Sequence, residues 1–199
     1  MARKPKAPAN VRPLRRDLKA RISDDVARRV RDGHPWIFAS ALKGRELPAT
    51  PGKCMDVVDE TSRVVGLAIR EPEGKPLLRV FCSTPGQDMD AGYVLDAIER
   101  CVTIRRSLLQ PAPLDCYRLV NGDSEGLPGV TVDRYADYLV VCQYTPLARV
   151  YQDHLLDGLE RALSPRGIYL QRRFTPPGAG KPRPGAELVR GQVAPNELL

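Results

Sequence analysis

Apolar residues in the first half of the chain recur in short runs with a period of two, which is the pattern of β-strands. Polar stretches rich in turn-forming residues separate these runs. Short strands joined by tight turns predict a small, mostly antiparallel barrel. The predicted strands are residues 53–58, 64–70 and 76–82, and the predicted turns are residues 59–62 and 71–74.

A short strand and a short helix are predicted ahead of this barrel. The alternation of apolar and basic residues over 18–22 favours a strand. Ser23 offers an N-cap for a basic helix that runs to about Arg31 and ends at Gly33. Residues 1–16 are rich in proline, alanine and basic residues, so we expect them to form a flexible arm.

The hydrophobic period changes to that of a helix at about Ala91 and keeps this spacing to Leu109. Asp88 or Asp90 can cap the start of this helix, and the prolines of residues 111–113 stop it. Charged residues occupy the face opposite the apolar stripe. The pattern therefore predicts an amphipathic helix that bridges two domains.

The most distinctive stretch of the chain lies at residues 117–135, where two alternating runs flank a cluster of turn-forming residues. Pro128 sets the φ of the first corner of a turn, and Gly129 can adopt the positive φ that a type II turn requires next. We therefore predict a β-hairpin whose loop exposes residues 123–125. That loop is either a solvated acidic turn or a site for a divalent metal ion.

Strand and helix patterns continue after the hairpin. Residues 174–184 contain glycine and lysine but lack the spacing of a phosphate-binding loop, because Pro182 stands where Ser or Thr is required. This segment is therefore predicted to be a linker. The predicted elements are a strand at 138–144, a helix at 148–163, and strands at 168–172 and 187–190.

Three segments together resemble one known family. Residues 117–135 are similar to the signature of the class I SAM-dependent rRNA cytosine-5 methyltransferases of the 23S rRNA large-subunit methyltransferase I type. Residues 33–38 resemble the PUA segment of that family, and residues 167–173 resemble the strand after its central helix. The signature residues are Arg118, Asn121, Gly122, Asp123, Glu125, Gly126, Leu127, Pro128, Gly129, Asp133, Arg134 and Tyr135.

The resemblance implies a PUA domain, a small central α/β domain and a C-terminal Rossmann-like methyltransferase domain, of which the third is expected to be absent from this chain. We therefore expect an α+β fold, with a PUA-like β-barrel followed by a central domain of hairpin, helix and strand. The expected divisions are a flexible basic arm (1–16), a PUA-like RNA-binding domain (17–84), a bridging helix and linker (85–114), a central α/β domain (115–191) and the start of a connection to the catalytic domain (192–199).

Positive charge is concentrated at one end of the chain. Residues 1–33 hold eleven Lys or Arg and four acidic residues, so this region carries the whole net charge of +7. Such a cluster indicates a polyanion partner, here ribosomal RNA of the large subunit, or else a solvated tail without a partner. The predicted RNA-binding residues are Arg15, Arg16, Lys19, Arg21, Arg28, Arg29, Arg31, His34, Trp36, Arg70 and Arg79.

Trp36 and Phe38 can serve in two ways. They can stack on unpaired bases, as aromatic residues do in many RNA-binding proteins. Burial in the core of the small domain is the use that its size favours, because such a domain needs its large aromatic residues inside.

Composition excludes several other classes. The five cysteines are widely spaced and only two histidines accompany them, so neither a zinc site nor a disulfide framework is predicted. No apolar run is long enough to span a bilayer and no secretory signal is present, so we expect a cytoplasmic protein without membrane or metal partners. A homodimer remains open.

The chemistry of the family is not found in this sequence. No glycine turn in the context of a SAM pocket occurs before Leu199, so we expect no catalytic or cofactor-binding residue here, no SAM binding and no activity of the chain alone. SAM is implied for the missing domain. Two alternatives stay open: a free-standing RNA-binding or ribosome-assembly module, and an independent enzyme that uses a cysteine or the pair Asp123 and Glu125.

Overall fold

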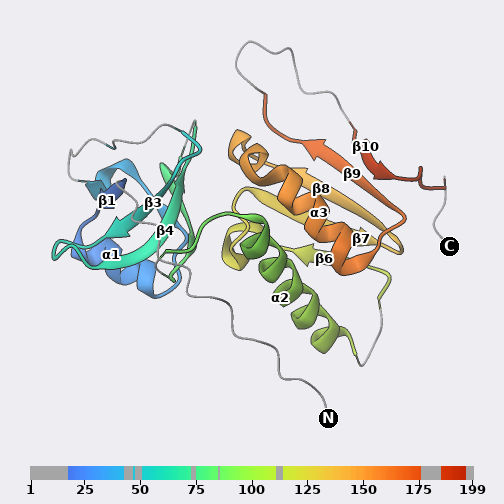
Figure 1. The fold of residues 1–199 in the computed structure, drawn as a ribbon, viewed down its shortest axis with the longest axis horizontal. Helices are drawn as coiled ribbons and strands as arrows, with labels where there is room; N and C mark the ends of the chain where they lie inside the picture. Colours follow the sequence, from blue (N-terminus) through green and yellow to red (C-terminus); the bar gives the residue numbers. More distant parts are fainter. Residues whose placement is uncertain are drawn as a thin grey trace.

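A computed structural model describes residues 18–42, 47, 51–72, 75–84, 86–110, 114–175 and 185–195. It shows two five-stranded sheets, one in each half of the chain (Figure 1). The predicted arm at residues 1–16, including Arg15 and Arg16, lies outside the described residues. In the part of the chain that is described, no helix has the length and apolar character needed to cross a bilayer.

The first sheet is built around two long antiparallel strands that curve over a small core. The strand order is β1-β3-β4-β5-β2; β1 is parallel to β3 and the other neighbours are antiparallel. The strands are β1 (Lys19–Arg21), β2 (Trp36–Ile37), β3 (Cys54–Val58), β4 (Val64–Arg70) and β5 (Leu78–Cys82), with the helix α1 (Asp24–Arg31) and the 3-10 turn η1 (Ala39–Leu42).

Helix α1 packs its apolar face on this sheet. Ala27 and Val30 are buried there, and they join Ile22, Ile37 and Met55 in one core cluster. The helix ends as the sequence predicts, because Gly33 adopts a φ of +93° that permits the chain to turn out of the helix.

The second sheet starts as a meander and ends with a crossover. Strands β6, β7 and β8 pair antiparallel in sequence, and the chain then returns through a helix so that β9 lies parallel to β8, with β10 antiparallel at the edge. The bounds are β6 (Cys116–Val120), η2 (Gly122–Glu125), β7 (Val130–Tyr135), β8 (Tyr138–Gln143), η3 (Pro146–Tyr151), α3 (Gln152–Leu163), β9 (Gly167–Arg172) and β10 (Glu187–Gly191).

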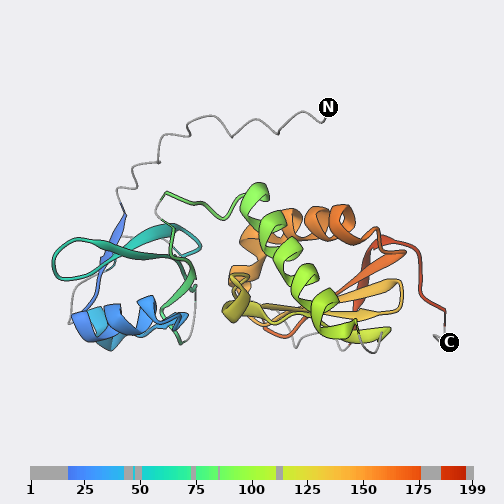
Figure 2. The same cartoon turned by 90° about the horizontal axis from the view of Figure 1, so that it is seen from below.

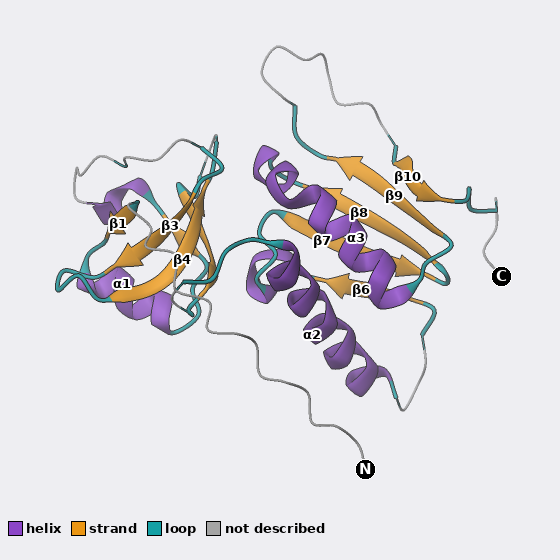
Figure 3. Ribbon diagram, viewed as in Figure 1, coloured by secondary structure: helices purple, strands orange, loops and turns teal. Residues whose placement is uncertain are grey.

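Helix α2 (Ala91–Leu109) packs against α3, and both helices lie on the same face of the second sheet (Figures 2 and 3). The predicted helix bounds and the cap are confirmed, because the Asp90 side chain accepts a hydrogen bond of 2.8 Å from the Tyr93 N–H. The helix predicted at 148–163 differs at its start. Its first turn is the 3-10 segment η3, which begins at Pro146.

A second core cluster extends across both halves of the molecule. Leu67, Ile69 and Phe81 of the first sheet belong to the same buried cluster as Tyr93 of α2 and Leu127, which follows η2. Helix α2 is therefore part of the second domain's helical layer as well as the connection between the domains.

Candidate functional site

Trp36 and Phe38 lie at the surface of the first domain, each 42% exposed. Strand β2 is at the edge of its sheet, and its alternation sends only Ile37 into the core. The prediction that these aromatic residues are buried is therefore wrong. Aliphatic side chains fill the core instead, which leaves both rings available for stacking on a base.

His34 stands beside Trp36, immediately after α1. The Trp36 N–H donates to His34 Nδ1 at 3.1 Å, and the two rings meet edge to face with their centroids 6.2 Å apart. Because Nδ1 accepts this bond, Nε2 is the ring nitrogen that can donate to an RNA group. The predicted pair His34 and Trp36 thus forms one exposed unit.

A cavity of about 450 Å³ continues this surface. It is lined by Phe38, Ala39 and Ser40 from one side and by Lys75 and Leu77 from the other. An aromatic ring, a hydroxyl and an exposed ammonium around one hollow provide the groups that a nucleotide requires: a stacking face, a hydrogen-bond partner and a positive charge.

The predicted basic residues of this domain differ in how firmly they are held. Arg28 and Arg29 are exposed on α1 and pair with Asp25 of the same helix. Such surface pairs contribute at most about 1 kcal/mol, so a phosphate can replace the carboxylate. Lys19 is exposed on β1, and Arg70 is half-buried at the end of β4.

Arg21 and Arg31 instead support the turn after β3. Arg21 Nη1 donates to the Glu60 carbonyl at 2.7 Å, and Arg31 Nη2 donates to the Asp59 carboxylate. Asp59 also accepts from the hydroxyl and N–H of Thr61 and from the N–H of Arg63. These bonds, that of the Thr61 hydroxyl first, lower the pKa of Asp59 to about 2 although its burial opposes the shift.

The acidic turn of the signature is a contact between the two domains. Asp123 of η2 accepts two bonds of 2.9 Å from Arg79 Nη1 on β5, and Arg79 Nε donates to Glu71 Oε2 at 2.6 Å. The side chains of Arg79 and Asp123 are only 11% and 17% exposed. We call the three residues Glu71, Arg79 and Asp123 the interdomain latch.

This placement corrects the prediction for Arg79. Burial on its own would lower the pKa of the guanidinium, but the hydrogen bonds and charges of Glu71 and Asp123 outweigh burial and raise it. Two carboxylates already occupy the side chain, so we assign Arg79 to holding the domains together instead of to RNA contact.

The second acid of the turn is paired as well. Glu125 accepts from Arg105 of α2 and, at 2.6 Å, from the N–H of Asn121. The interpretation of this loop as a solvated acidic turn is therefore wrong. Within the described residues, no group of three or more His, Cys, Asp or Glu side chains is arranged to hold a metal ion, and both acids already have arginine partners.

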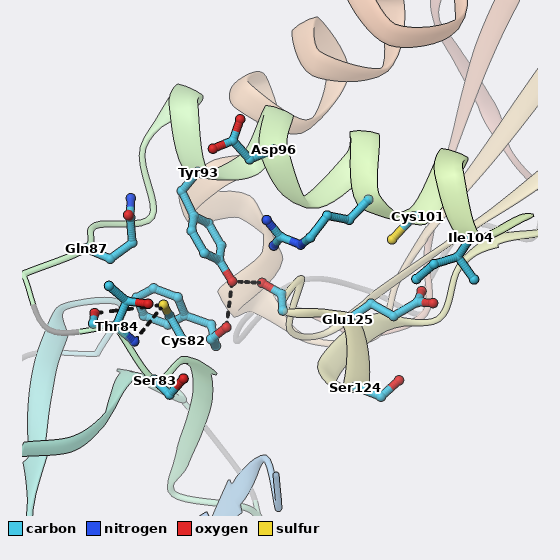
Figure 4. Close-up of a pocket in the computed structure, with 13 residues that line it drawn as sticks. Cys82, Ser83, Thr84, Gln87, Tyr93, Asp96, Cys101, Ile104, Ser124 and Glu125 are labelled. Atoms are coloured by element: carbon cyan, nitrogen blue, oxygen red, sulfur yellow. Dashed lines mark hydrogen bonds between the residues drawn. The ribbon is translucent and has the colours of Figure 1, made fainter. Parts of the chain in front are cut away.

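Glycines and tyrosines complete the junction around the signature turn. Gly129 adopts the predicted positive φ, at +77°, and Tyr151 donates to the Pro128 carbonyl at 2.6 Å. The Tyr93 hydroxyl lies 2.5 Å from the Phe81 carbonyl and 3.1 Å from that of Gly126 (Figure 4). A Cβ on Gly126 would lie 2.3 Å from this hydroxyl, so only glycine fits there.

A cleft of about 530 Å³ opens beside this junction, between the end of β5, α2 and the signature turn (Figure 4). Cys82, Ser83 and Ser124 line it together with Arg100 and the half-exposed Ile104 of α2. Cys101 also lines the cleft, but burial, and next the charge of Glu125, raises the pKa of its thiol to about 12. It is protonated at neutral pH and is therefore a poor nucleophile.

Comparison with known proteins defines the class of the first domain. The PUA-like domain family matches residues 20–83, a segment that runs from β1 to just beyond β5. Residues 20–83 thus form a PUA-like domain, as the sequence predicts.

The chain is 32% identical over 169 residues to ribosomal RNA large subunit methyltransferase I of Cronobacter sakazakii, covering 83% of this chain and 42% of that protein. It is 29% identical over 160 residues to the protein of the same name from Escherichia coli K12, covering 80% and 39%. The family resemblance of the sequence is confirmed: the chain is homologous to these methyltransferases, consistent with their N-terminal part, and spans about two-fifths of their length.

Solved structures share the fold. A candidate SAM-dependent methyltransferase from Streptococcus mutans superposes with a TM-score of 0.74 at 16% identity, over 89% of this chain and 44% of that chain. A candidate methyltransferase solved in complex with SAH gives the same values. At this level of identity, the likeness concerns the arrangement of both domains.

The crossover of the second sheet does not fit a SAM-binding turn. In the second sheet, the strand–helix–strand unit with parallel strands is β8–α3–β9, where such a turn would follow the first strand. The residues after β8 are Tyr144, Thr145 and Pro146, without a glycine, and the next residue, Leu147, is buried.

Proposed function

We propose that this chain is the RNA-binding, substrate-positioning region of an rRNA (cytosine-5) methyltransferase, in which a catalytic domain outside this chain transfers the methyl group from SAM. Large-subunit ribosomal RNA is the proposed partner, which also implies a cytoplasmic location. The observation that carries the proposal is the exposed aromatic and basic surface of a PUA-like domain whose relatives are rRNA methyltransferases.

The surface combines two kinds of contact. Trp36 and Phe38 offer rings to unpaired bases, and Arg28 and Arg29 of the adjacent helix offer charges to phosphates. Stacking on an aromatic side chain contributes about 1–3 kcal/mol per base, while phosphate contacts add affinity that salt weakens. The surface is therefore suited to a structured RNA with an unpaired segment.

Positioning requires that the two domains keep a constant geometry. The shared core, the interdomain latch and the Tyr93 hydroxyl hold the PUA-like domain against the second domain. In this proposal the RNA bound on the first domain is presented at a defined distance from whatever follows the second domain in the whole enzyme. A flexible linker between the two domains would not keep this distance constant.

The test uses the intrinsic fluorescence of Trp36, the single tryptophan of the chain. Titration with a large-subunit rRNA fragment that contains an unpaired loop should quench its emission. Trp36→Ala should weaken binding by about 5- to 150-fold, the equivalent of one lost stack, whereas Trp36→Phe should retain most of the affinity. Leu108→Ala, at an exposed residue of α2, is the matched control and should bind as the unaltered chain does.

Unchanged emission and equal affinity of all three variants would reject the proposed surface. Absence of any RNA binding by the unaltered chain at low salt would reject the proposed function itself. A preference for rRNA fragments over other RNA of equal length, lost in Trp36→Ala, is the expected result.

A further inference from the structure

The second sheet has one face that no described helix covers. Helices α2 and α3 both pack on the opposite face (Figures 2 and 3). Leu119, Val132 and Leu139 point toward those helices and are fully buried in the core. The residues that alternate with them point the other way, and we call this side the open face.

The open face is largely polar and aromatic, with the aliphatic Val140 between Asp133 and Tyr169. Arg118 pairs with Asp133 on the neighbouring strand through bonds of 2.9 and 3.2 Å. The next row toward the first domain holds Thr131 and Cys142, and the Cys142 thiol donates to Gln171.

Two tyrosines project at the ends of this face. Tyr135 is 41% exposed and Tyr144 is 45% exposed. They flank β8, so about six residues at roughly 3.3 Å per residue separate them by about 20 Å. That distance accommodates several nucleotides of an extended RNA single strand.

Positive charge accompanies the rings. The Arg166 guanidinium lies 5.8 Å from the centre of the Tyr138 ring, and strand alternation places Arg173 on the same face as Gln171. The acid Asp133 lies on this face too, but Arg118 already neutralises it, so that Arg166 and Arg173 leave the face positive. The charge favours a polyanion.

We propose that the open face of the second sheet binds single-stranded RNA, with bases stacked on Tyr144 and Tyr135 and phosphates held by Arg166 and Arg173. The proposal rests on the proposed function, which supplies RNA as the partner. Proteins commonly bind unpaired bases on the face of a sheet, where aromatic rings stack on the bases and nearby basic side chains contact the phosphates. A protein partner would instead favour an aliphatic centre with charge depleted from it.

The chain allows the two surfaces to be observed separately. In the double variant Trp36→Phe/Tyr144→Trp, the only tryptophan stands on the open face, whereas in the unaltered chain it stands on the PUA-like domain. A short single-stranded oligoribonucleotide should quench the emission of this double variant. A blunt RNA duplex of the same length should leave it unchanged, because its bases are already stacked.

Affinity measurements supply the second test. Tyr144→Ala should weaken binding of the single strand by about 5- to 150-fold, and Tyr144→Phe should restore it because the ring remains. Arg173→Gln should lower the slope of log affinity against log salt by about 0.7, the value for one phosphate contact on a single strand. Leu108→Ala serves again as the exposed control, and thermal unfolding checks that each variant is folded.

The outcomes separate the two proposals. If the unaltered chain binds RNA and Trp36 responds, but Tyr144→Ala binds equally well and the reporter at position 144 is silent, the open face is rejected and the proposed function stands. If neither reporter responds and no RNA binds, both are rejected. If Tyr144→Ala changes the sedimentation coefficient of the RNA-free protein but not its RNA affinity, the face joins two copies of the chain and the RNA site is overturned.

Discussion

Replacing Arg79 by methionine should strongly destabilise the molecule, because its guanidinium is the positive charge between the two carboxylates of the interdomain latch. Methionine approximates the length of the arginine stem but removes the charge between Glu71 and Asp123. The Glu71 side chain is 2% exposed, and its Oε1 has no hydrogen-bond partner in the described part of the chain. Without Arg79, a buried carboxylate would be left unpaired.

The expected loss follows from this burial. Removing one partner of a buried ion pair costs about 3–5 kcal/mol, because the remaining charge stays desolvated. For a chain of this size, that corresponds to a fall in unfolding temperature of about 6–20 °C. Arg118→Met is the matched control, since the pair of Arg118 with Asp133 is more exposed and should contribute about 1 kcal/mol or less.

Urea unfolding followed by Trp36 fluorescence and by far-UV circular dichroism measures these differences. Glu71→Leu in the Arg79→Met background should recover much of the loss, because the more deeply buried of the two unpaired carboxylates is then removed, while Asp123 is 17% exposed to water. A loss below about 1 kcal/mol for Arg79→Met would refute the argument. So would a double variant that is less stable than Arg79→Met alone, since this would mean that packing around Arg79 matters and its charge does not.

Three further predictions concern other parts of the chain. Gly129→Val should cost about 1 kcal/mol or more in thermal unfolding, because φ is +77° and an added Cβ would lie 2.9 Å from Thr145 Oγ1, whereas Ser124→Ala should be nearly silent. The pKa of Asp59 is lowered from 3.8 to about 2, so its contribution to stability is present above pH 3.8 and is lost as the pH falls through about 2; Asp59→Asn should flatten unfolding midpoints measured across that window. Deleting residues 1–16, which carry six basic residues, should lower the salt slope of rRNA binding by about 2–4 units if most of them contact phosphates, while RNA sequence preference survives; an unchanged slope would identify the arm as a solvated tail.

Local patterns were sufficient to predict most of the elements. Strand β4 and helix α2 have the bounds expected from their periods, because a run of apolar residues between polar turns, or a capped helix with one apolar stripe, is determined within its own segment. The exposure of Trp36 could not be predicted in the same way. Strand β2 has two residues at a sheet edge, and which of them faces the core depends on its pairing with β5.

The roles of the charged residues depended on distant partners. Arg79, in the predicted strand 76–82, has the same local pattern as a surface arginine. Asp123, in a loop of turn-forming residues, has that of a solvated acid. They meet only because β5 and η2 come together across the domain boundary, 44 positions apart in sequence. The role of the two acids in the signature turn, as ion-pair partners of Arg79 and Arg105, is therefore seen only in the three-dimensional structure.

The signature stretch serves two structural purposes at once, and this follows from the alternation of its strands. The turn and the inward-facing residues of β6 and β7 anchor the second domain to the PUA-like domain and to its own helices. The intervening residues Arg118, Asp133 and Tyr135 have no part in that packing and lie on the open face. A single stretch can thus fix the position of a domain while presenting a polar and aromatic surface to RNA. Because the two sets of side chains point to opposite faces, Tyr135→Ala should change RNA affinity with little effect on the urea midpoint, whereas Asp123→Ala should do the reverse.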